Sequence, residues 1–319
     1  MVRHPRSMVL IVAAMLSCCG PSQPGAKPPS RILPPPNTAS DPTSNDRTPK
    51  ETLVSMQDLE KKVLAKDPAA VDLAKSVGAS ATPRLIELAS NADAGVRRIA
   101  VNCIRRTGGP AAPGAFLNAA KDENSQVRGS AMAGLKACPD PLPFMPLLEI
   151  FNSMEDPDQR CEMCFILTDN SIGDVQAKQT VSGLLKTKIP LEKESPELRD
   201  AMLASLAKLG DEDARKAFAL SLSASENEQE WLRKVEACDW ISQDWLPKAM
   251  LPMLAVKDEV ERIGVDARPD LPHYLRVCDK AAQTICRIAK PKLAFDPATK
   301  INLKDAELGE IREAIRKMP

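Results

Sequence analysis

Apolar residues recur along the chain at the spacing of one face of an α-helix. Between residues 96 and 104, the apolar positions lie at offsets of 0, 3, 4, 7 and 8 and are Val96, Ile99, Ala100, Cys103 and Ile104. The same spacing returns in segments that begin near residues 127, 159, 198 and 277. No segment shows sustained alternation of apolar and polar residues between hairpin turns, so we expect an all-α fold.

The helices are expected in pairs joined by short turns. Several starts are marked by a residue that can cap a helix followed directly by proline, which suits the first helical position: Thr48-Pro49, Asp67-Pro68, Thr82-Pro83, Asp156-Pro157, Ser195-Pro196 and Asp296-Pro297. The expected pairs are 83–90 with 96–106, 113–121 with 125–137, 143–153 with 157–168, 171–186 with 196–209, 211–222 with 227–241, and 244–255 with 273–289, closed by a capping helix at 304–317.

An arginine recurs near the start of the second helix of successive pairs. These residues stand at intervals of 31, 32, 39 and 34 positions and are Arg97, Arg128, Arg160, Arg199 and Arg233. A further 45 residues on, Cys278 occupies the slot, and the extra length falls in the loop 256–272. Self-similarity at such a period is typical of a helical solenoid.

The recurring pattern Asp…Val-Arg-x-x-Ala-x-x-Ala-Leu over residues 68–290 resembles the HEAT repeat, in the short form first associated with phycobilisome lyases. The resemblance implies a right-handed, armadillo-like α-solenoid of stacked antiparallel helix pairs. It also implies that the repeated arginine is structural and pairs with carboxylates of neighbouring turns, for which Asp93, Asp122 and Asp156 are candidates. An arginine ladder that grips an anionic ligand is the other interpretation. The register near residue 233 is open, because Asp239 or Trp240 falls where the repeat has a small residue.

Composition narrows the function. Hydrophobic residues make up 43% of the 319 residues but aromatics only 3%, which suits thin helix layers better than one large core. Lys+Arg and Asp+Glu balance at 43 each, so the net charge does not favour nucleic acid. With two histidines, of which His4 lies in a segment expected to be removed, a histidine-rich metal site is excluded and no metal or cofactor is expected.

The N-terminus has the features of an export signal. Charged residues precede an apolar run at residues 8–16 that is too short to span a bilayer, and Ser17-Cys18-Cys19 follows. This ending resembles the lipobox of bacterial lipoproteins, which implies that Cys18, or alternatively Cys19, carries acyl chains such as palmitate. An ordinary cleaved signal with incidental cysteines is the other interpretation. We therefore expect a signal peptide at 1–17, a proline-rich tether at 18–47 and the solenoid at 48–319.

The remaining cysteines offer one motif. Cys161 and Cys164 form a Cys-x-x-Cys sequence, yet Cys161 lies about a turn inside its expected helix, away from the N-terminal dipole that lowers a thiol pKa. Packing of small side chains is therefore favoured over a redox pair, and no second such motif completes a zinc site. Export would permit disulfides, such as one between Cys238 and Cys278, but the sequence does not assign them.

Two surface features are candidates for binding. Arg98, Asn102 and Arg105 lie off the apolar stripe of their helix, and Trp231 belongs to a tryptophan cluster with Trp240 and Trp245. A solvated face and a packed cluster are the respective alternatives.

The expected function follows from the repeats, the lipobox and the lack of a catalytic motif. We expect an exported, membrane-anchored, non-catalytic scaffold that binds an unidentified envelope protein or peptide, in the outer membrane or periplasm if the envelope has two membranes. A lyase-like or thiol-redox accessory protein acting on another envelope protein is the alternative.

Overall fold

The computed structural model describes residues 49–191, 195–223, 225, 227–262, 274–300 and 302–318. The predicted signal peptide, the tether with Cys18 and Cys19, and the predicted cap at Thr48 lie outside these ranges. Contacts group Thr48–Pro319 into one compact unit.

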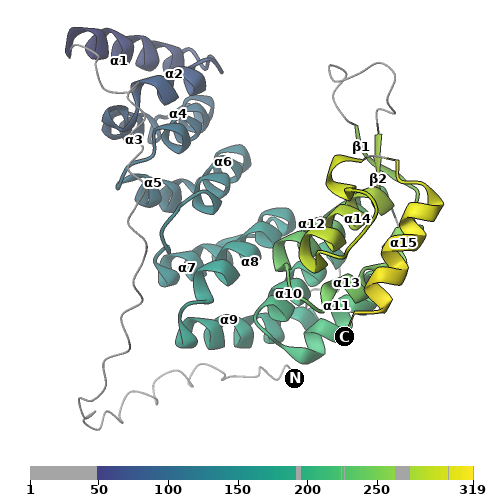
Figure 1. Cartoon of the computed structure of the whole chain (residues 1–319). Helices are drawn as coiled ribbons and strands as arrows, with labels where there is room; N and C mark the ends of the chain where they lie inside the picture. Colours follow the sequence, from purple (N-terminus) through teal and green to yellow (C-terminus); the bar gives the residue numbers. More distant parts are fainter. Residues whose placement is uncertain are drawn as a thin grey trace, which may run out of the picture. The chain divides into compact units, whose positions relative to one another are not determined.

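The described part of the chain is all-α apart from one short hairpin, as predicted (Figure 1). The α-helices there are α1 Pro49–Leu64, α2 Ala70–Val77, α3 Thr82–Leu88, α4 Ala94–Thr107, α5 Ala112–Ala119, α6 Ser125–Lys136, α7 Phe144–Ser153, α8 Pro157–Ser171, α9 Val175–Lys188, α10 Pro196–Lys208, α11 Glu212–Ser221, α12 Glu228–Ile241, α13 Leu246–Ala249, α14 Val277–Ala289 and α15 Asp305–Arg316. Short 3₁₀ helices lie at Ala79–Ala81, Ile189–Leu191, Leu251–Ala255 and Pro297–Thr299.

Side-chain caps begin several of the helices where the sequence predicts them. Asp156 accepts the Gln159 N–H at 3.1 Å, and Ser195 Oγ accepts the Leu198 N–H at 3.3 Å. The prediction at Thr82 was wrong, because Thr82 lies inside α3 and Ala81 precedes it. The Thr82 hydroxyl instead contacts the Gly108 carbonyl at 2.8 Å, so it ties α3 to the end of α4 rather than capping its own helix.

Several other predicted boundaries were also wrong. The helix predicted at 171–186 is α9, which begins at Val175 because α8 continues to Ser171. Helix α2 begins at Ala70 rather than after Asp67, whose carboxylate accepts the Ala69 N–H in a preceding turn. Asp296 begins a 3₁₀ turn instead of an α-helix. The segment predicted as one helix at 244–255 divides into α13 and a 3₁₀ helix, since Pro252 has no N–H to continue an α-helical ladder.

A two-stranded antiparallel hairpin was not predicted. Strand β1 (Glu259–Arg262) pairs with β2 (Tyr274–Arg276), and α14 follows β2 directly instead of beginning at 273. The N–H groups of Val277 and Cys278 donate to the carbonyls of Asp258 and Val256, both at 2.9 Å, and so join the start of α14 to the segment before β1. Strands this short carry too few residues for alternation to be read from sequence.

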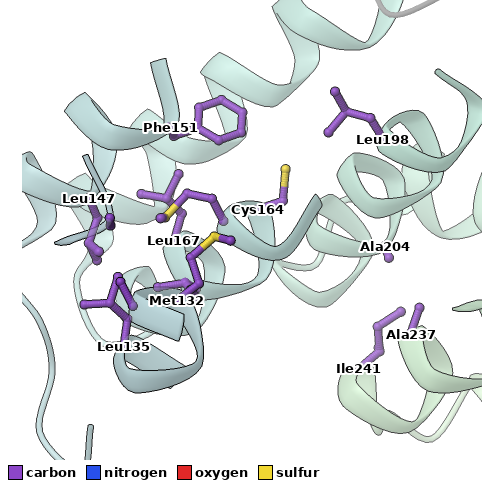
Figure 2. Packing of buried hydrophobic residues seen from close by; sticks show 14 of the residues in the cluster. Met132, Leu135, Leu147, Phe151, Cys164, Leu167, Leu198, Ala204, Ala237 and Ile241 are labelled. Carbon is purple, nitrogen blue, oxygen red and sulfur yellow. The ribbon is translucent and has the colours of Figure 1, made fainter. Parts of the chain in front are cut away.

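The helices contact one another in chain order. Within a pair, α3 packs on α4, α5 on α6 and α7 on α8, and the second helices form the series α2, α4, α6, α8, α10, α12 and α14, each contacting the next. The pair α1–α2 precedes the first pair that the sequence predicts. Figure 2 shows buried apolar side chains from α6, α7, α8, α10 and α12 within one cluster. A continuous core therefore runs along the second helices and leaves their other flank to form a surface.

A candidate binding groove on the second helices

The first predicted arginine binds the turn of the following pair. Arg97 Nε and Nη2 donate to the two carboxylate oxygens of Asp122 at 2.7 and 2.8 Å, and Nη1 donates to the carbonyls of Asn91 and Ala92. Burial raises the pKa of Asp122, but the hydrogen bonds from Arg97 and from the Asn124 N–H outweigh it, so the pKa lies below its ordinary value. This arginine is fully engaged in joining two pairs.

The neighbouring predicted partner, Asp93, does not bind Arg97. Its carboxylate accepts the N–H groups of Gly95 and Val96 as the cap of α4 and pairs with Lys66 at 2.8 Å. In the next pair, Arg128 Nε donates to Gln159 Oε1 at 2.6 Å, where the sequence predicts a carboxylate. Arginine thus bridges successive turns, with different acceptors in each.

The other predicted arginines have different surroundings. Arg160 lies 5.5 Å from the centre of the Phe151 ring, Arg199 is exposed, and the exposed Arg233 donates to Glu197 at 3.0 Å. In that last pair the buried cation is Lys234, which is 4% exposed and donates to the Ser221 carbonyl at 2.9 Å and to Glu230 at 2.6 Å. The sequence left the repeat register near residue 233 open. In the structure the buried repeat position on α12 is 234, one residue after the arginine.

The two thiols of the Cys-x-x-Cys motif lie against the core. Burial raises the pKa of Cys161 to about 12, and Cys164 is wholly buried among the side chains of Figure 2. A redox dithiol needs an accessible thiolate near neutral pH, so this environment disfavours thiol exchange.

The other described cysteines form no disulfide in this structure. Burial raises the pKa of Cys103 to about 12 and that of Cys286 to about 11, and it also raises the pKa of Cys238. Cys238 and Cys278 are not joined by a disulfide in this structure.

The three tryptophans differ in exposure to solvent. Trp231 is buried, at 7% exposed, with Lys234 Nζ 5.9 Å from its ring centre, and Trp245 donates to Gln243 at 2.8 Å. Trp240 is partly exposed, and its Nε1 donates to Asp169 Oδ2 at 2.9 Å. Trp231 therefore cannot provide an exposed contact, whereas Trp240 can.

Trp240 forms one wall of a cavity of about 440 Å³ on α8, α10 and α12. Its ring centre lies 4.5 Å from that of Phe165, and Lys208 fixes the arrangement by donating to Asp169 and to the Trp240 carbonyl at 2.8 and 2.9 Å. Small side chains on α10 and α12, Ala201 and Ala237, leave the space open. We refer to this cavity as the groove.

The groove combines apolar walls with ionisable groups. Its charged lining residues are Lys136, Asp169, Glu197, Asp200, Glu230, Arg233, Lys234 and Glu236, so carboxylates outnumber cations. Burial raises the pKa of Asp200, and the attraction of Lys234, 3.8 Å away, does not offset it. The volume of the groove, about 440 Å³, falls in the range typical of ligand-binding sites.

Sequence reasoning singled out Cys161, Trp240 and the repeat arginine Arg233 from this lining but missed the rest. The available signal is that Cys161, Phe165 and Asp169 on α8, and Glu236 and Trp240 on α12, follow the spacing of four residues that places side chains on one helix flank.

Two further cavities lie beside the groove residues. One of about 1150 Å³ between α12, α14 and the segment 290–298 shares Glu236 and Trp240 with the groove. The other, of about 610 Å³, lies between the α6–α7 and α8–α9 turns and shares Asp169 with it.

The predicted basic edge lies elsewhere, on α4. Arg105 is exposed, while Arg98 and Asn102 are half-buried, and none of the three lines a described cavity. The structure therefore does not bring these residues together with Trp231 on α12.

No group of three or more potential metal ligands occurs among the described residues. Within the same ranges, no helix combines the length and apolar character needed to cross a bilayer. No protein-family model and no curated protein matches the sequence.

Proposed function

We propose that this protein is a lipid-anchored, non-catalytic binding module of the bacterial cell envelope, built as a right-handed HEAT-like solenoid of antiparallel helix pairs. The groove on α8, α10 and α12 is the observation that carries the proposal, because three successive second helices supply one concave, partly apolar surface. Stacked helix pairs typically bind partners over such surfaces.

The partner in this proposal is a protein or peptide of the envelope. Phe165 and Trp240 offer aromatic area together with polar groups already held in position by Lys208 and Asp169. Aromatic residues fixed in this way are favoured at protein interfaces.

The alternatives from the sequence receive less support. A thiol-redox role requires Cys161 to ionise, and its raised pKa opposes this. A lyase-like role rests on the resemblance to the short HEAT repeat alone. The anchor rests on the lipobox at Cys18 or Cys19.

The test is to fill the groove and compare bound proteins. We suggest Ala237→Leu, which adds three carbon atoms at a lining position, and Ala306→Leu, at an exposed position of α15, as the matched control. Both full-length chains are recovered from crosslinked envelope membranes, and the co-purifying proteins are quantified by mass spectrometry.

The proposal predicts that at least one envelope protein is retained by the wild type and by Ala306→Leu but depleted at least tenfold by Ala237→Leu. Melting curves show whether Ala237→Leu remains folded. If the folded variant keeps every protein that the control keeps, the groove is not the binding surface.

A further inference from the structure

The cations around the groove are already held by carboxylates of the same chain. Arg233 donates to Glu197 at 3.0 Å, Lys234 donates to Glu230 at 2.6 Å, and Lys136 lies 3.5 Å from Glu162. Their charge is therefore not available for an anionic ligand, which would also face the five carboxylates that line the cavity.

Two lining carboxylates are less compensated. Asp200 has its nearest cationic nitrogen, Lys234 Nζ, 3.8 Å away, and that nitrogen is closer to Glu230. Glu236 is exposed and forms no ion pair within 4 Å among the described residues. Burial raises the pKa of Asp200, which means that its negative charge is under-solvated and would be favoured by an added cation.

The apolar walls of the groove favour a cation that carries an apolar stem. Phe165 and Trp240 lie side by side, and Ala201 and Ala237 leave room next to them. Lysine and arginine combine an apolar stem with a charged head, so their stems can lie on aromatic rings while the head reaches a carboxylate.

The adjoining cavity indicates a polypeptide rather than a small free cation. Glu236 and Trp240 line both the groove and the cavity of about 1150 Å³ beside α14, so an extended segment can pass from one to the other over α12. The cavity of 440 Å³ itself suits one long side chain and its neighbours.

From this geometry we infer that the groove binds a lysine or arginine side chain on an extended segment of the partner protein, with its charged head at Asp200 and Glu236 and its stem against Phe165 and Trp240. This inference rests on the proposed function and adds the chemistry of the segment that is recognised.

The test uses a phage-displayed library of random dodecapeptides, selected on the full-length chain purified in detergent. We expect the selected peptides to share one lysine or arginine, and replacement of that residue by norleucine to weaken binding roughly tenfold or more, since a charge-assisted contact is lost. Affinities are measured by fluorescence anisotropy with labelled peptides.

Two charge-neutralising variants locate the contact. Asp200→Asn and Glu236→Gln should each weaken the binding of the selected lysine or arginine peptide by several-fold or more, while Asp213→Asn, at an exposed position of α11, leaves its affinity unchanged. Because burial disfavours the ionised form of Asp200, Asp200→Asn should keep or raise the melting temperature. Weaker binding then cannot be attributed to unfolding.

The outcomes separate the inference from the proposed function. Selected peptides without lysine or arginine, which nevertheless lose binding in Ala237→Leu, would overturn the inference and leave a peptide-binding groove. Equal affinity of basic peptides for Asp200→Asn, Glu236→Gln and the wild type would also overturn it. Selection of no peptide at all would count against both.

Discussion

The contact between Gly134 and Phe116 gives the sharpest test of how the helix pairs pack. Gly134 lies on α6, and a methyl group added there would meet the Phe116 ring of α5 at 2.5, 2.6 and 2.7 Å. Carbon atoms in ordinary contact are about 3.5–4.0 Å apart, so either the ring or the helix must move by about 1 Å. Phe116 is 3% exposed, which leaves the ring little room.

The magnitude follows from two opposing effects. Overpacking a well-filled core costs about 1–3 kcal/mol, whereas glycine to alanine within a helix contributes about 1 kcal/mol of stability. On the same helix, Gly129 has no atom within 4 Å of the position that a methyl group would take, so Gly129→Ala should show the stabilising effect alone. The two variants should therefore differ in stability by about 1–3 kcal/mol.

The assay is urea unfolding of the full-length chain followed by circular dichroism at 222 nm. Gly134→Ala should lower the unfolding midpoint and Gly129→Ala should raise it, and Phe116→Leu combined with Gly134→Ala should recover part of the loss. If Gly134→Ala were as stable as Gly129→Ala, α5 and α6 would not pack as closely as described.

Three other changes test separate parts of the account. Arg97→Ala should destabilise the chain by about 3 kcal/mol because it removes both guanidinium hydrogen bonds from the Asp122 carboxylate, which is 11% exposed, whereas Arg105→Ala, on an exposed part of the same helix, should change the free energy of unfolding in urea by less than about 0.5 kcal/mol. The pKa of Asp122 is lowered on folding, so its ionised form contributes stability above about pH 4 that is lost as the pH falls. The difference in free energy of unfolding between wild type and Asp122→Asn should therefore narrow between about pH 5 and pH 2. A difference that stays constant over this range would contradict this. If Cys18 is acylated, Cys18→Ser should abolish incorporation of labelled palmitate while Cys19→Ser retains it, and the reverse result would move the site by one residue.

Local sequence signals predicted the helices well where one interaction decides the outcome. Asp156 and Ser195 cap α8 and α10, and each is followed by the proline that suits the first turn of a helix. The same type of signal failed at Thr82, where the end of α4 offers the Gly108 carbonyl to the hydroxyl, a contact between residues 26 positions apart. Such a contact depends on the packing of two helices and cannot be read from the neighbouring residues.

The repeat arginines were likewise predicted only in part. The resemblance to the HEAT repeat implied that the arginines pair with carboxylates of neighbouring turns. Asp122, one of the candidates, does bind Arg97, whereas the candidate Asp93 is occupied by the start of its own helix and by Lys66. In α12 the buried cation is Lys234 rather than Arg233, because Lys234 faces the Ser221 carbonyl at the end of α11. The HEAT-like pattern therefore predicts which helix carries the buried cation on α12 but misses its position by one residue.

The groove was largely beyond prediction from the sequence. Its residues lie between Lys136 and Trp240 on several helices, and the hydrogen bond from Trp240 to Asp169 joins residues 71 positions apart, so no single helix carries the whole pattern. The alanines that keep the space open, Ala201 and Ala237, are indistinguishable in the sequence from the other small residues of the repeats.

Site-specific photocrosslinking tests the central claim most directly. A benzophenone-bearing residue is placed at the exposed groove position Arg233, which takes no part in the inferred contact, and, as the matched control, at the exposed Asp213 of α11, in the full-length chain expressed in its own envelope. We predict one discrete adduct from position 233, with the crosslinked partner peptide containing a lysine or arginine, and no such adduct from position 213. The same adducts from both positions, or none from position 233, would contradict the assignment of the groove as the binding surface.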